Sequence, residues 1–421
     1  MVLHRKSVRF ALGLLACAAA ATALAAPAAA VKRRAFVTSI SGTGNLSTWP
    51  GATGATALER ADNICRSRAA AGALPNAATY RAWLSAGTTD AYCHVQGLAG
   101  TKAGGCGGAA LPGAGPWFLA NGISNFTGTL EELVGPERVI FRPVMLDEFQ
   151  NAVDTDYFTR QIWTGTFPTG AGGEDCSDWT TSALASPGAY GDALGSANTW
   201  TRFTNSSCED SHRLLCLEPG ASETVTLGWS PGALVFVSSV AGSADLSTWA
   251  ESGGAVGINA GYAICAQLAS AAHLPDPDSF VPFLSTPAVD ARDRLTTDGP
   301  FRRVDGYAVA NTLADLLDGA NQNSLHVYED GRYADDDLRV WTGTSADGTG
   351  SASGTCSGWT ENASGFGVTG KASAARMGEW TDINAFTCAE PQNLYCFSNA
   401  ITLFWDGFEN GGTARWSATA P

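Results

Sequence analysis

The sequence predicts an α+β fold, and it predicts that fold twice along the chain. One apolar face at helical spacing runs through residues 56–72, and Gly72 ends it. The members of this face are Leu58, Ala61, Ile64, Cys65 and Ala69. Short runs with β-branched and aromatic residues predict strands at 34–40, 79–85, 160–166 and 212–218. One helix mixed with short strands and long Gly- and Ser-rich loops is typical of the α+β class.

The chain contains two tandem copies of one unit. Residues 36–49 read FVTSISGTGNLSTW and residues 236–249 read FVSSVAGSADLSTW, an offset of 200 without a gap. Further along, WTGT at 163 returns at 341, and CSDWT at 176 returns as CSGWT at 356. Units of this length are expected to bury a core of their own. The sequence therefore predicts a first domain at 33–219, a linker at 220–232, a second domain at 233–399 and a C-terminal tail at 400–421.

The N-terminus has the pattern of an export signal. A basic start, MVLHRKSVR, precedes an apolar run that ends in small residues, so residues 1–25 are predicted to be a cleaved signal peptide. The segment LLAC is also typical of a lipoprotein processing site, which makes a lipid anchor on Cys17 the alternative. Both hypotheses place the protein outside the cytoplasm, secreted into the extracellular space or periplasm or held at the cell surface. No later segment has the length and apolarity of a membrane span.

The chain is acidic once the predicted signal peptide is removed. Without residues 1–25 it keeps 22 Lys and Arg against 40 Asp and Glu, a net charge of 22 − 40 = −18. A surface of this sign repels nucleic acid and anionic membranes, so neither is an expected partner.

The cysteines predict a disulfide framework. Ten of the 11 cysteines remain when Cys17 is set aside, an even number in a chain predicted to be exported. The first copy has 16 residues more than the second before GPWFLANG at 115–122, and these include Cys93 and Cys106. The other eight divide into four per copy, and four cysteines allow three pairings that the spacing alone leaves open.

The order of the motifs resembles the C-type lectin-like fold. In each copy a helix carries the first cysteine, a WTGT strand leads to Cys-x-x-Trp, and a Cys-x7-Cys pair ends the unit as CEDSHRLLC or CAEPQNLYC. More closely, the pattern is similar to endostatin, the C-terminal domain of certain collagens. It is also similar to a secreted bacterial family of unknown function, related to endostatin-like adhesins on the surface of spirochaetes. The resemblance covers both copies, which make up most of the chain.

The resemblance implies two nested disulfides in each copy. They are Cys65–Cys216 around Cys176–Cys208, and Cys265–Cys396 around Cys356–Cys388. Cys93 and Cys106 would then pair with each other inside the insert. Each long bridge is expected to stabilise the fold by roughly 4 kcal/mol, mainly by restricting the unfolded chain.

Asp382 is the candidate metal ligand. Sugar-binding C-type lectins hold calcium with a Trp-Asn-Asp triplet before the third cysteine and a Glu-Pro-Asn triplet upstream. Here the first triplet is Trp380-Thr381-Asp382, the upstream triplet is missing, and the first copy has Arg202 at the position of Asp382. Calcium takes roughly six to eight oxygen ligands. No metal or other cofactor is therefore expected, with calcium at Asp382 as the alternative.

Other candidate features favour structural roles. Tryptophans matched between the copies are expected in the core, and the alternative is an exposed aromatic platform for a glycan. They are Trp49, Trp163, Trp179, Trp200, Trp249, Trp341, Trp359 and Trp380. Endostatin binds zinc through N-terminal histidines, and the resemblance raises the question of a zinc site here. The histidines after the predicted signal peptide are scattered and lack the spacing of metal ligands, so no zinc site is expected. They are His94, His212, His273 and His326. The acidic segment 328–341 is expected to be a solvated loop before the WTGT strand, with a cation bound in its turn as the alternative.

The sequence favours binding over catalysis. It contains no nucleophile elbow, zinc-protease motif or phosphate loop, so the protein is not expected to be an enzyme. The prediction is an exported binding or adhesion protein that recognises an extracellular protein or glycan, with the loops 166–199 and 344–379 as its favoured surface. The alternatives are a calcium-dependent carbohydrate-binding lectin and a hydrolase with an unrecognised carboxylate site.

Overall fold

The computed structural model describes residues 31–403, except for residues 155, 226–229, 320, 335, 352–353 and 376–377. The predicted signal peptide with Cys17, and residues 404–421 of the predicted tail, lie outside the described residues. The described chain is α+β, as the sequence predicts, with two mixed sheets and few helices. Within this part of the chain, every helix is too short or too polar to cross a membrane.

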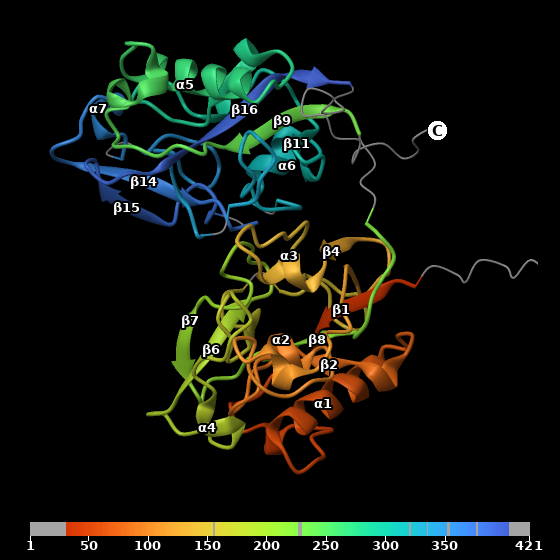
Figure 1. The fold of residues 1–421 in the computed structure, drawn as a ribbon. Coiled ribbons are helices and arrows are strands. Elements are labelled where there is room, and N and C mark those ends of the chain that lie inside the picture. Colours follow the sequence, from red (N-terminus) through yellow and green to blue (C-terminus); the bar gives the residue numbers. More distant parts are fainter. Residues whose placement is uncertain are drawn as a thin grey trace, which may run out of the picture. The chain divides into compact units, whose positions relative to one another are not determined.

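The first repeat, residues 33–219, builds an eight-stranded sheet (Figure 1). Its strands are β1 (Arg33–Val37), β2 (Arg81–Ala82), β3 (Trp117–Leu119), β4 (Asn125–Thr127), β5 (Gln161–Trp163), β6 (Pro187–Asp192), β7 (Thr204–Ser207) and β8 (Arg213–Leu217). Its helices are α1 (Ala57–Ala71), α2 (Ala91–His94) and α3 (Leu130–Val134), and a helical turn, α4, covers Cys176–Trp179.

The first and last strands of the repeat lie side by side in the middle of the sheet. The strand order is β4-β3-β1-β8-β5-β6-β7, with β2 also paired to β8. β8 runs antiparallel to β1, with Phe36 opposite Cys216, and parallel to β5. Because β8 comes last in the repeat, the sheet is complete only when both ends of the unit have met.

Helix α1 begins and ends where the sequence predicts. The side chain of Thr56 accepts a hydrogen bond from the backbone N–H of Glu59, and the Glu59 carboxylate accepts one from the backbone of Thr56, a capping box that satisfies two free N–H groups. The backbone of Gly72 closes the last turn. The buried face includes Ala61, Ile64 and Cys65, and the Cys65–Cys216 disulfide joins the helix to β8.

The core of the first repeat lies on both faces of the sheet, because successive strand residues point to opposite sides. Ala35 and Val37 pack into one buried cluster with Trp117. Phe36, between them in β1, packs into the other cluster with the apolar face of α1. Strands that are buried on both faces have few polar positions, which fits the apolar pattern of β1 and β8.

The second repeat has the same strand order, β12-β11-β9-β16-β13-β14-β15, with β10 paired to β16. Its strands are β9 (Gly232–Val237), β10 (Phe280–Pro282), β11 (Phe301–Arg303), β12 (Ala308–Ala310), β13 (Arg339–Trp341), β14 (Phe366–Lys371), β15 (Asn384–Thr387) and β16 (Asn393–Thr402). Its helices are α5 (Ile258–Ala271) and α6 (Leu313–Leu317), and α7 (Cys356–Trp359) is a turn. Phe236 lies opposite Cys396, as Phe36 lies opposite Cys216.

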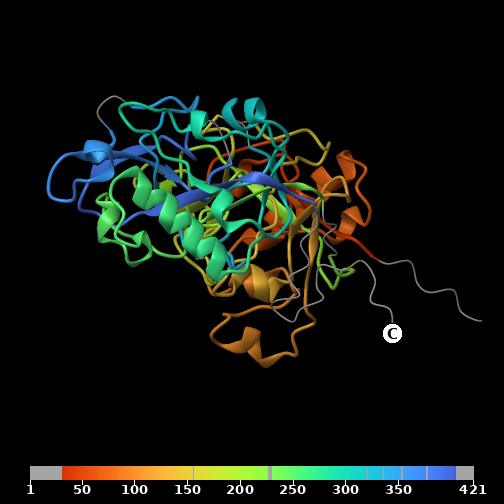
Figure 2. The same cartoon turned by 90° about the horizontal axis from the view of Figure 1, so that it is seen from above.

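The last strand of the second repeat is longer than the sequence predicts. β16 reaches Thr402, so residues 400–402 of the predicted tail belong to the sheet, where Ile401 pairs with Ala233 and Thr402 with Gly232. Figure 2 shows α5 beside this long strand, to which the Cys265–Cys396 disulfide ties it.

The strand predicted at 79–85 is in fact two residues long. Arg81 and Ala82 pair with β8, after which the N–H of Trp83 donates to Leu215 and the N–H of Ser85 donates to Thr164. The segment therefore passes from β8 toward the end of β5, and it cannot keep one ladder of hydrogen bonds. Local composition predicts extended backbone here but not the change of partner.

The CSDW and CSGW motifs form left-handed turns. Cys176, Ser177, Asp178 and Trp179 have φ values of 53°, 55°, 58° and 55°. In the second repeat Cys356, Ser357, Gly358 and Trp359 follow the same path, with φ between 44° and 71°. Left-handed backbone costs roughly 1–2 kcal/mol for each residue that has a Cβ, and glycine avoids this cost. The two repeats differ at the third position, where the first has Asp178 and the second has Gly358.

We expect Asp178→Gly to stabilise the protein by about 1 kcal/mol, because glycine adopts the left-handed conformation without strain. The Asp178 side chain is exposed, so little else is lost. Guanidinium unfolding followed by tryptophan fluorescence would measure the change.

The reverse substitution is the matched control. Gly358→Asp should destabilise by a similar amount, since a Cβ there meets only Pro287 at an ordinary 3.9 Å and backbone strain is the main cost. A stabilising effect of Gly358→Asp would contradict the strain argument.

Candidate functional site

Five disulfides join the ten cysteines of the described chain, and they are the pairs that the resemblance implies. They are Cys65–Cys216, Cys93–Cys106, Cys176–Cys208, Cys265–Cys396 and Cys356–Cys388. The Cα atoms of each pair lie 5.4–5.7 Å apart, an ordinary separation for a disulfide. These cysteines are therefore structural.

The eight matched tryptophans lie in the core, as predicted. The most exposed of them, Trp249, is 6% exposed, and six are fully buried. Six of them donate their indole N–H to a backbone carbonyl; Trp163, for example, donates to Gly42 at 2.9 Å, and Trp179 donates to Ser85 at 2.8 Å. Those of Trp200 and Trp380 have no hydrogen-bond partner among the described residues. They do not form an exposed platform for a ligand.

Asp382 lies in the turn between Trp380 and β15, with its side chain exposed. Partial burial of the carboxylate raises the pKa of Asp382 above its ordinary value. At the matched position of the first repeat, Arg202 donates to Glu174 at 2.8 Å and stacks over the Phe167 ring. Among the described residues, no three His, Cys, Asp or Glu side chains gather closely enough to hold a metal ion.

The acidic segment 328–341 contains several ion pairs. Arg332 contacts Asp330 at 2.6 Å, and Lys371 contacts Asp337 at 2.9 Å. The Glu329 carboxylate accepts hydrogen bonds from the backbone and hydroxyl of Ser239, which joins the segment to the end of β9. These pairs give the segment a structural role.

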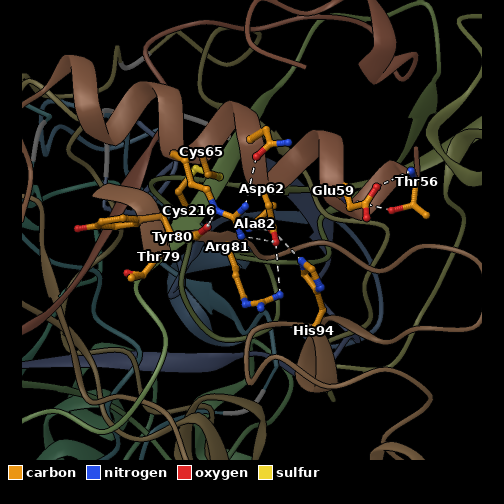
Figure 3. Close-up of polar contacts among 12 residues, drawn as sticks. Thr56, Glu59, Asp62, Cys65, Thr79, Tyr80, Arg81, Ala82, His94 and Cys216 are labelled. Carbon is orange, nitrogen blue, oxygen red and sulfur yellow. Dashed lines mark hydrogen bonds and ion pairs between the residues drawn. A yellow bond between two sulfur atoms is a disulfide. The ribbon is translucent and has the colours of Figure 1, made fainter. Parts of the chain in front are cut away.

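A buried carboxylate on α1, Asp62, gathers a cluster of polar groups that the sequence analysis missed (Figure 3). Its Oδ1 accepts a hydrogen bond from the backbone N–H of Ala82 at 3.0 Å and contacts the His94 Nε2 at 2.8 Å. Arg66 and Arg81 approach the other oxygen at 3.3 and 3.4 Å. The cluster ties α1 to β2 and to α2, which lies in the insert.

The second repeat makes the same connection with different groups. Tyr262 stands at the position of Asp62, and its hydroxyl accepts a hydrogen bond from Arg294 at 3.2 Å. Arg294 also donates to the carbonyl of Leu284, just after β10. Since an acid–histidine pair in one repeat is replaced by a phenol–guanidinium pair in the other, we assign the Asp62 cluster to structure. In the described part of the chain, no serine or cysteine side chain hydrogen-bonds to His94, so the cluster lacks the nucleophile of a hydrolytic triad.

The best candidate for a binding site is a cavity of about 470 Å³ in the first repeat, which we call the β5–β8 cavity. Its walls come from four separate segments of the chain. They are Ser41, Tyr157, Phe158, Thr159, Gln161, Tyr190, Ser206, Asp210, Ser211, His212 and Arg213. The volume is within the range of ordinary small-molecule sites, and the mixture of aromatic and polar walls is typical of them.

Aromatic side chains form one wall of the β5–β8 cavity. The hydroxyls of Tyr157 and Tyr190 are hydrogen-bonded at 2.8 Å, and the Phe158 ring meets Tyr157 edge-on with the ring centres 5.3 Å apart. Phe158 is 73% exposed, so most of its ring is open to solvent. Burial, together with the hydrogen bond to Tyr157, raises the pKa of Tyr190, which keeps it a neutral phenol.

The polar wall carries one acid and one base. Asp210 accepts a hydrogen bond from the hydroxyl of Ser206. Arg213 donates to the carbonyls of Thr159 and Thr38, at 2.5 and 2.7 Å. With Asp210 and Arg213 as the charged groups of its lining, the cavity has a net formal charge of zero.

His212 lies at the back of the β5–β8 cavity, between the rings of Trp163 and Tyr190. Its ring centre is 4.1 Å from that of Trp163 and 4.9 Å from that of Tyr190. The side chain is 4% exposed, and neither ring nitrogen has a hydrogen-bond partner among the described residues. Burial lowers the pKa of His212 to about 4, against the opposing effects of Asp210 and of the nearby Ser211 backbone, which lies outside good hydrogen-bond geometry.

The β5–β8 cavity was not predictable from the motifs of the sequence. The favoured loops 166–199 contribute only Tyr190 to its walls. His212 was noted only as one of four scattered histidines. One signal in the sequence does point to His212. Gln392 occupies the equivalent position in the second repeat, so the two repeats differ there.

We expect Asp62→Ala to destabilise the protein by about 3 kcal/mol, because the change leaves His94 and two arginines without their common partner. Chemical denaturation would measure the loss. Asp278→Ala, at an exposed carboxylate of the second repeat, is the control and should have an effect near zero. A small effect of Asp62→Ala would mean that the cluster does not hold α1.

We expect His212 to make the protein sensitive to acid. The folded state keeps the imidazole neutral down to about pH 4, whereas the unfolded chain protonates near the ordinary value of 6.5. The contribution of neutral His212 is therefore complete above pH 6.5 and is lost as the pH falls from 6.5 to 4. By pH 5 the loss is about 2 kcal/mol.

His212→Gln places the residue of the second repeat at this position and removes the titrating group. The fall in unfolding free energy between pH 7 and pH 5 should then be about 2 kcal/mol smaller than in the parent. His273→Gln, at an exposed histidine, is the control. Equal pH dependence of His212→Gln and the parent would show that His212 is not held neutral.

Comparison with protein-family models and with curated proteins identified no relative: no protein-family model matches the chain, and the search of curated proteins gave no match.

Proposed function

We propose that the protein is an exported, non-enzymatic binding or adhesion protein that recognises an extracellular glycan or protein. The β5–β8 cavity is the observation that carries the proposal. It combines an exposed aromatic side chain, Phe158, with hydroxyl, carboxylate and amide groups on a folded wall. Such a mixture suits recognition, because apolar faces supply contact area and polar groups fix orientation.

The proposal includes two C-type lectin-like, endostatin-like domains as the fold. It is supported by the two nested disulfides of each repeat, since the resemblance implies the same pairs. The equal strand order of the two sheets is what a duplicated unit would have. Five disulfides are compatible with an oxidising compartment outside the cytoplasm.

An array of glycans and matrix proteins, probed with residues 26–421, tests the function. We expect at least one partner to bind, and to stay bound when calcium is removed with EDTA. The reason is that Asp382 is an exposed single carboxylate in its turn, and calcium needs several oxygen ligands.

Two outcomes would contradict this expectation in different ways. Binding that disappears both in EDTA and in Asp382→Ala would favour the calcium-dependent lectin. A chain that is folded by near-ultraviolet circular dichroism but binds no glycan and no protein would overturn the proposed function as a whole.

A further inference from the structure

The two repeats share their framework but differ at the β5–β8 cavity. The framework positions correspond closely: Tyr190 lies opposite Trp163 in the first sheet, and Thr369 lies opposite Trp341 in the second. His212 bridges to Gly42, and Gln392 bridges to Gly242 in the same way. The substitutions at the cavity wall are Ser41 by Ala241, Gln161 by Arg339, Tyr190 by Thr369, Ser206 by Phe386, Ser211 by Pro391, His212 by Gln392 and Arg213 by Asn393.

The aromatic wall depends on a segment that is longer in the first repeat. Val153 and Ala334 hold equivalent places, since their N–H groups donate to Met145 and His326. Seven residues separate Val153 from Gln161, whereas four separate Ala334 from Arg339. Tyr157 and Phe158 lie in this longer segment, which brings them over β6.

The second repeat presents a different surface at the same place. The Arg339 guanidinium lies over the Phe386 ring, 5.9 Å from its centre, where Gln161 and Ser206 line the first cavity. The two repeats therefore keep one framework, and the first repeat has a cavity wall whose composition differs from that of the second.

The chemistry of the wall points to a sugar ring. A pyranose has apolar C–H faces and a rim of hydroxyls that both donate and accept hydrogen bonds. Phe158 offers an exposed face for stacking. Ser41, Ser211 and Asp210 are exposed polar groups that line the same cavity, and they can form hydrogen bonds with the hydroxyls of a sugar.

The charges favour a neutral sugar over an anionic one. Arg213 is engaged by two backbone carbonyls, and Asp210 would repel a carboxylate or sulfate. The net charge of −18 for residues 26–421, 22 − 40, acts in the same direction.

We propose that the β5–β8 cavity of the first repeat binds a neutral pyranose sugar without calcium, with the sugar ring stacked on Phe158. This inference rests on the proposed function, and it names the class of ligand that the protein would bind. The cavity is distinct from the turn at Asp382, which belongs to the second repeat.

Isothermal titration calorimetry of residues 26–421 with methyl glycosides of glucose, galactose and mannose, in the presence of EDTA, tests the proposal. N-acetylneuraminic acid and a heparin disaccharide are the anionic comparators. We expect at least one neutral glycoside to bind and both comparators to fail.

The variants locate the site. Phe158→Ala changes an exposed side chain and should weaken binding about tenfold. Tyr190→Thr combined with His212→Gln, which installs residues of the second repeat, should abolish it. Phe366→Ala is the matched control, since Phe366 is 58% exposed and lies in β14 of the second repeat. It should leave binding unchanged.

Other results would overturn the inference. These are binding of anionic sugars alone, binding that requires calcium, or equal affinity of Phe158→Ala and the parent. If the array finds a protein partner and no neutral glycoside binds, the proposed function stands and this inference fails. If the array finds no partner and no glycoside binds, both fail.

Discussion

The disulfide between α1 and the central strand is the interaction on which each repeat depends. Cys65 lies in the apolar face of the helix, and Cys216 lies opposite Phe36 where the first strand meets the last. The bridge spans 151 residues of sequence, so it restricts nearly the whole unfolded unit, by roughly 5 kcal/mol in the loop-entropy model. It fixes the helix against the sheet, and the inner disulfide then fixes the hairpin beside it. The second repeat uses the same arrangement through Cys265 and Cys396.

A frame held in this way tolerates local change. The buried Asp62 and His94 pair of one repeat gives way to Tyr262 and Arg294 in the other, yet the helix keeps its place. The insert with Cys93–Cys106 adds its own short bridge to the first repeat alone. The buried polar contacts that hold the helix therefore differ between the repeats, whereas the matched cysteines and tryptophans are the same in both.

Much of the fold could be predicted from sequence, for local reasons. Thr56, Glu59 and Gly72 mark the helix ends through capping, and the duplication marks the repeats. The strands could be located but not their lengths, because Ser85 changes its backbone partner within one segment. The left-handed turn at Asp178 escaped prediction, although Gly358 at the matched position is a signal for it. The β5–β8 cavity could not be predicted because its walls meet only in the tertiary structure. Tyr157 and Tyr190, for example, are 33 residues apart in the sequence.

The difference between the repeats has a consequence for valency. A duplicated binding unit ordinarily offers two sites, and two linked sites raise the effective concentration of a ligand that carries several epitopes. In the described part of this chain, Phe158 and Tyr190 stand in one repeat, while Thr369 and Phe386 stand in the other. If the β5–β8 cavity binds a sugar as proposed, one chain would contact a repeating polymer through the first repeat, and its residence time on that polymer would be that of a single contact. Firm attachment would then come from many chains side by side on one surface, and a chain released from that surface would bind as a monovalent competitor.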